Sequence, residues 1–132
     1  MSSAKVRYLK INFDEIFLRL REYAESKAAT HGVKAIVLVG SLAKGTYTGT
    51  SDADILVIAD NLPSDILDRY ALFSDPTMPI DVEPIVYTLD EFVNKVRQGD
   101  HLAVESLEIG IPIHGEQFFN DLRKSLTNPS IR

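Results

Sequence analysis

The chain has 132 residues, enough for one domain with a hydrophobic core of its own. With 14 Lys and Arg against 19 Asp and Glu, its net charge is −5, which argues against duplex nucleic acid as an obligate partner. Cysteine is absent, which excludes disulfides, thiolate metal sites and a cysteine nucleophile. The sequence has neither the ~20-residue apolar run of a membrane span nor a signal-peptide core, so it predicts a soluble, cytoplasmic protein without a membrane partner.

The first predicted element is a long amphipathic helix. Asn12 and Glu15 have the spacing of a capping box, and apolar residues then recur at helical spacing. Gly32 is expected to end this helix. Residues 1–11, which show no clear period, are expected to be a loose terminus.

Two short apolar runs follow, over residues 35–39 and 55–59, and each is typical of a buried strand. The second run is entered through Asp52 and Asp54, which project to the same side because side chains alternate along a strand. Two like charges so placed repel each other unless a cation lies between them. Mg²⁺ suits such a pair, since it prefers a few carboxylates together with water and phosphate oxygens.

The first run ends at Gly40-Ser41. Gly40 allows a ligand to approach the backbone closely, and a helix beginning at Ser41 would offer free amide groups to a phosphate. Ser41 is also a good helix cap, and the two roles are compatible. Lys44 either reaches a triphosphate or is only solvated. A P-loop is excluded, because Thr46 stands where that motif requires its lysine.

The rest of the chain alternates helices and strands. The remaining predicted elements are, in order, a short helix capped by Ser64, a strand over 80–87, a helix that Thr88 and Glu91 open as a capping box and that continues to about residue 98, a helix over 100–108, a strand over 111–114, a helix over 116–126 and a loose terminus over 127–132. This order predicts a single α/β (α+β) domain over residues 1–132, a small mixed sheet with helices packed mainly on one face.

One predicted apolar strand ends in Gly40-Ser41, ten residues intervene, and Asp52-Ala53-Asp54 opens the second apolar strand. This pattern resembles the signature of the DNA polymerase β-type nucleotidyltransferase superfamily. The resemblance is closest to its small stand-alone members, often called minimal nucleotidyltransferases, and spans roughly residues 12–115. It implies the nucleotidyltransferase fold and supplies the strand order that periodicity alone does not give.

The resemblance also implies a nucleotide site formed by Gly40, Ser41, Lys44, Asp52 and Asp54. The two aspartates would hold two Mg²⁺ ions, with Mn²⁺ as the alternative, and would act in catalysis.

A third catalytic and metal-binding carboxylate is implied on a neighbouring strand, between apolar residues. Asp81, between Ile80 and Val82, fits this description better than Glu83, because Pro84 disturbs the strand next to Glu83. Asp81 is therefore the expected ligand, and it could also accept the proton of the acceptor. Glu83 stays as the alternative.

The implied reaction is transfer of a nucleoside monophosphate from a triphosphate, ATP being the expected donor, to an acceptor hydroxyl. Small relatives are often paired with a helical HEPN-type protein in toxin–antitoxin modules, where the nucleotidyltransferase acts as antitoxin and in some cases adds AMP to the toxin. The alternative is a non-catalytic interaction module that keeps only the fold. The sequence leaves the acceptor and any homo-oligomer open.

Overall fold

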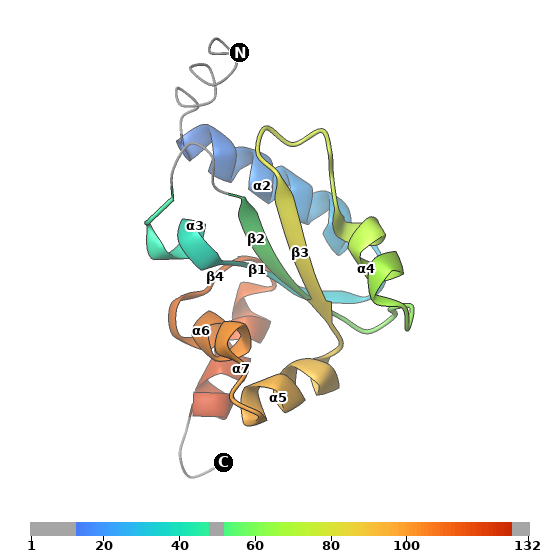
Figure 1. Cartoon of the computed structure of the whole chain (residues 1–132), viewed down its shortest axis with the longest axis vertical. Helices are drawn as coiled ribbons and strands as arrows, with labels where there is room; N and C mark the ends of the chain where they lie inside the picture. The colour runs from blue at the N-terminus through green and yellow to red at the C-terminus, as the bar shows by residue number, and fades with distance from the viewer. Residues whose placement is uncertain (1–12, 48–51, 128–132) are drawn as a thin grey trace.

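A four-stranded mixed sheet lies at the centre of the protein (Figure 1). The computed structural model describes residues 13–47 and 52–127. The strands are β1 (Val33–Val39), β2 (Ala53–Ala59), β3 (Val82–Tyr87) and β4 (Ile111–His114), arranged in the order β3-β2-β1-β4. β1 is antiparallel to both β2 and β4, whereas β2 and β3 are parallel. The predicted mixed sheet is confirmed.

The helices of the described residues cover both faces of this sheet. They are α2 (Phe13–Ala28), α3 (Gly40–Lys44), α4 (Ile66–Phe73), α5 (Leu89–Arg97), α6 (His101–Ile109) and α7 (Glu116–Thr127). In Figure 1, α2 lies in the upper half of the view, and α5, α6 and α7 lie in the lower half.

The alternating side chains of β1 and β2 divide the core into two clusters. Ile36 and Ile55 pack with α2 and with Phe73 of α4, whereas Val37 and Leu56 pack with α5, α6 and α7. The prediction that helices pack mainly on one face was therefore wrong. The central strands are apolar on both sides, so both sides must be covered.

Several predicted boundaries shift by a few residues. The capping box of Thr88 and Glu91 is confirmed. Asp65, rather than Ser64, caps α4, because its carboxylate accepts the backbone N–H of Leu67 at 2.7 Å.

Other boundaries differ at the ends of elements. β3 begins at residue 82 instead of 80, and α2 ends at residue 28, before the turn that contains Gly32. Residue 127, predicted to be loose, belongs to α7. The predicted cap at Asn12 and the termini 1–11 and 128–132 lie outside the described residues.

α4 is fixed beside the edge strand β3 by buried polar contacts. The Arg69 guanidinium binds both carboxylate oxygens of Glu91 on α5, at 2.7 and 3.2 Å, and donates to the carbonyl of Val86 on β3. At the other end of α4, the hydroxyl of Tyr23 on α2 donates to the carbonyl of Phe73. These contacts set how the exposed side chains of α4 face β3.

Of the helices formed by residues 13–47 and 52–127, none has the length and apolar character needed to cross a membrane.

Candidate active site

Antiparallel pairing brings the end of β1 beside the start of β2. Val39 pairs with Asp54, so Gly40 follows directly next to that aspartate. Gly40 has a φ of +67°, and a Cβ at this position would fall on the Asp54 carboxylate. Only glycine combines this backbone conformation with so close an approach. The structure therefore joins the two halves of the sequence motif in direct contact.

The parallel pairing of β2 with β3 places two further carboxylates, those of Asp81 and Glu83, at this corner. Asp54 pairs with Glu83, and the backbone N–H of Ala53 donates to the carbonyl of Asp81 at 2.7 Å. Ala53 faces the cluster under α2, so the alternation of a strand directs its neighbours Asp52 and Asp54 to the opposite face.

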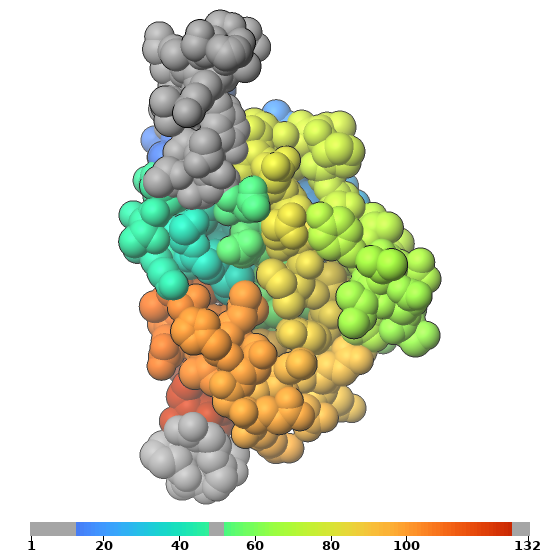
Figure 2. Space-filling view, viewed as in Figure 1, coloured from blue at the N-terminus to red at the C-terminus, as the bar shows by residue number. Residues whose placement is uncertain are grey.

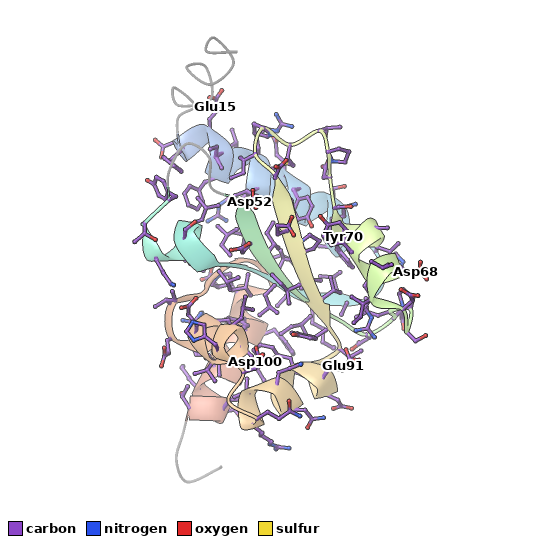
Figure 3. The ribbon with its side chains drawn as sticks, in the orientation of Figure 1. Glu15, Asp52, Asp68, Tyr70, Glu91 and Asp100 are labelled. Carbon is purple, nitrogen blue, oxygen red and sulfur yellow. The ribbon has the colours of Figure 1, made fainter. Side chains whose placement is uncertain are left out.

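This corner of the sheet reaches the surface. In Figure 2 the start of β2, in green, is visible between α3, in teal, and β3, in yellow. Figure 3 places Asp52 at the upper end of β2.

The surroundings of Asp54 raise its proton affinity. Partial burial raises the pKa of Asp54 above its ordinary value, and the charges of Asp52 and of Glu83 raise it further, in that order. Asp54 is therefore held in a negative field that a cation would relieve.

In residues 13–47 and 52–127, no three carboxylate or imidazole groups lie close enough together to hold a metal ion. Like charges turn apart when nothing neutralises them. Three of the carboxylates named above can therefore bind one cation only after their side chains rotate toward it.

Tyr70 belongs to this corner as a polar group, although the pattern of the short predicted helix gives no sign of that role. Its hydroxyl forms a long hydrogen bond, 3.5 Å, with Oε1 of Glu83. The pKa of the phenol is raised, first by the charge of Glu83, then by burial and by this hydrogen bond, with smaller effects from Asp81 and Asp52. The two residues are 13 positions apart, and no local pattern announces their contact.

A cavity of about 410 Å³ lies between α4 and β3 and opens onto the same carboxylates. Its lining includes Tyr70 and Ser74 on one side, with Asp81 and Glu83 on the other. Both candidates for the third carboxylate therefore face a space that could admit a second molecule.

Lys44 and Ser41 have other contacts than those predicted. Lys44 forms an ion pair of 3.0 Å with Glu105 on α6, so it is not simply solvated. α3 begins at Gly40, and the capping position is Val39, without a side-chain bond. Ser41 is thus not the cap. Its carbonyl instead accepts the backbone N–H groups of Gly45 and Thr46, which closes the turn after α3.

Comparison with known proteins shows the family of this chain. A family model described as a nucleotidyltransferase domain matches residues 18–113. A protein of Methanocaldococcus jannaschii named "Putative protein adenylyltransferase" is 49% identical over 41 residues, which cover 31% of this chain and 28% of that protein.

Among solved structures, one described as a toxin–antitoxin with AMP-PNP superposes with a TM-score of 0.55. It is 19% identical, and the match covers 78% of this chain and 79% of the other. This likeness concerns the fold alone.

Replacing Gly40 by Ala should destabilise the protein more than replacing Gly45 by Ala. Both glycines have positive φ, so both substitutions carry the left-handed strain of about 1–2 kcal/mol. Only at Gly40 does the new methyl group meet Asp54, whose carboxylate must then move aside, so the loss at Gly40 should be the larger one. Urea denaturation measures both variants. Equal losses would show that the contact between Gly40 and Asp54 does not resist an added methyl group.

Replacing Asp54 by Asn should stabilise the protein at neutral pH when no divalent cation is present. The pKa of Asp54 is higher in the folded than in the unfolded state, so the folded state binds more protons and stability falls as the pH rises through that interval. The gain of the variant should shrink as the pH is lowered toward about 4, near the ordinary carboxyl pKa.

Asp60→Asn is the matched control, because Asp60 lies at the other end of β2 and pairs with Lys34 at 3.3 Å. It should show no gain in urea denaturation at either pH. A destabilised Asp54→Asn protein at pH 7 would contradict the repulsion inferred at this corner.

Proposed function

The chain belongs to the nucleotidyltransferase domain family. From this premise we propose that it transfers a nucleoside monophosphate from a metal-bound triphosphate, with ATP as the expected donor, to an acceptor hydroxyl. Pyrophosphate is released. The observation that carries the proposal is the direct contact between the Gly40 turn and Asp54, with Asp52 beside them.

The chemistry of the donor groups fits divalent metal ions. Asp52, Asp54 and Asp81 offer only carboxylate oxygens, the ligands that Mg²⁺ and Mn²⁺ prefer in proteins. The raised pKa of Asp54 supports the fit, since it reports negative charge that a cation would compensate. When bound there, two ions would lower the pKa of the acceptor hydroxyl and neutralise the leaving pyrophosphate.

We assign the remaining roles to the chain itself. The backbone at Gly40 and Ser41 would hold the outer phosphates, since the absence of a Cβ at Gly40 leaves room for close approach. Asp81 would face the acceptor and take its proton. Glu83 is the less suitable metal ligand, because its carboxylate already accepts the hydrogen bond of Tyr70. Lys44 would contribute to phosphate binding only by leaving Glu105.

We further propose that the acceptor is a protein, in the first place a small helical partner of the HEPN type to which this chain would be the antitoxin. The name of the Methanocaldococcus relative and the description of the toxin–antitoxin structure support this choice. So does the surface of α4, the helix that carries Tyr70: Ile66 and Leu67 at its start are each 77% exposed, and adjacent exposed apolar side chains are typical of protein contacts.

Asp54→Asn should lower nucleotide transfer by about 100-fold or more, because it removes a charge that stabilises the metal-bound transition state without changing side-chain size. The measurement uses purified protein, Mg²⁺, each α-³²P-labelled triphosphate in turn and a lysate or candidate partner, with label on protein as the readout. Asp60→Asn, at the far end of β2, should keep full activity.

Two results would contradict this mechanism. One is undiminished labelling by Asp54→Asn. The other is the absence of any heat of binding when Mg²⁺ and millimolar ATP are titrated into the wild type, which would favour the non-catalytic interaction module.

The choice between the two candidates for the third carboxylate has its own test. Asp81→Asn should lower transfer by about 100-fold, as expected for loss of a metal ligand, whereas Glu83→Gln should retain activity within about ten-fold because its amide can still accept a hydrogen bond. Binding of Mn²⁺, followed by electron paramagnetic resonance, should weaken only in Asp81→Asn. The reverse order of effects would make Glu83 the ligand.

A further inference from the structure

Tyr70 brings a nucleophilic hydroxyl to the proposed active site. The residue is 40% exposed and borders the cavity that Asp81 and Glu83 also line. Its hydroxyl points at Glu83, which pairs directly with Asp54. Figure 3 shows Tyr70 on α4, across β3 from Asp52.

α4 holds this hydroxyl in place. The neighbouring residue, Arg69, is buried and bound to Glu91, to Val86 and to the carbonyl of Pro63 at 2.6 Å, so the backbone that carries Tyr70 is anchored to β3 and α5. The tyrosine therefore faces the carboxylates as a consequence of the fold and is not brought there by a mobile segment.

We propose that Tyr70 is a self-modification site: the chain transfers a nucleoside monophosphate to its own Tyr70 hydroxyl. This inference rests on the function proposed above. The phenol oxygen attacks the α-phosphorus of the triphosphate, the bond between the α-phosphorus and its bridging oxygen breaks, and pyrophosphate leaves. The phenolic proton passes to Glu83, and the product is a phosphodiester on Tyr70.

Ser74 is the rival hydroxyl in the same cavity. Its Oγ donates to the carbonyl of Ala71 at 3.4 Å, away from the carboxylates, whereas the hydroxyl of Tyr70 donates to Glu83. A nucleotide attached to Tyr70 would occupy the cavity beside Asp81 and would keep another acceptor out. The modification would thus hold the protein inactive until the nucleotide is removed.

The test incubates the full chain with Mg²⁺ and each α-³²P-labelled triphosphate, without any partner, and locates the label by peptide mass spectrometry. We expect the label on Tyr70, a loss of at least about ten-fold in Tyr70→Phe, and no loss in Tyr87→Phe. Tyr87 is the matched control, because it lies on the same strand as Glu83, about 13 Å further along at the usual rise per residue.

Two further readouts separate a reaction within one chain from a reaction between chains. The labelling rate per molecule should not change with protein concentration. In a mixture of Asp54→Asn with Tyr70→Phe, neither chain should be labelled, since one lacks the active site and the other lacks the acceptor. A readout that needs no turnover is the NMR spectrum: Mg²⁺ with a non-hydrolysable ATP analogue should shift the ring signals of Tyr70 and leave those of Tyr87.

Labelling at Ser74 or at another residue, labelling in the mixture, or unshifted Tyr70 signals would each overturn the inference. If the wild type labels a partner in an Asp54-dependent manner and Tyr70 stays unmodified, self-modification is refuted and the proposed function stands. If the wild type neither binds Mg²⁺ with ATP nor labels any protein, the proposed function fails and this inference fails with it.

Discussion

The site depends on the register of three strands. Val39 pairs with Asp54, which places the Gly40 turn next to the aspartate. Asp54 also pairs with Glu83, which places the carboxylates at the start of β3 beside it. A slip of one residue would turn every side chain of β2 to the other face. Asp54 would then enter the apolar cluster under α2, where an unpaired carboxylate is strongly unfavourable. The apolar side chains of β1 and β2, which hold no ligand themselves, therefore determine where the charged ones meet.

The carboxylate of Asp54 is held against its own preference for solvent and for distance from like charges. Burial and like charges raise the pKa of Asp54, and the Gly40 backbone packs closely against the same carboxylate. Neither feature helps the fold, and both are held by the two clusters that pack on opposite faces of the sheet. Local rules that are broken where the surrounding structure is well packed are typical of functional sites. The proposed catalytic role gives these features a reason that stability does not.

The sequence predicted those features of the fold and the site that short stretches of residues determine. Apolar runs located β1 and β2, the Thr88 capping box was found from four residues, and the spacing from Gly40 to Asp52 led to the family that the comparison shows. The sequence did not predict features that depend on contacts between residues far apart in the chain. Periodicity does not say which face a helix covers, so the helices were assigned to one face. Likewise, the ion pair of Lys44 with Glu105 joins positions 61 residues apart, and the contact of Tyr70 with Glu83 crosses from a helix to a strand.

The charges around the site also bear on how a triphosphate could bind. Two basic side chains on the helices around the sheet are already engaged: Lys44 neutralises Glu105 of α6, and Arg69 neutralises Glu91 of α5. Asp52, Asp54 and their neighbours on β3 thus present negative charge to a substrate that is itself strongly negative, and the two repel each other. Under the proposed function, divalent cations that enter with the triphosphate would attract both the carboxylate and the phosphate oxygens and so offset this repulsion. The distribution of charge among the described residues thus supports the proposed metal dependence by an argument separate from family membership.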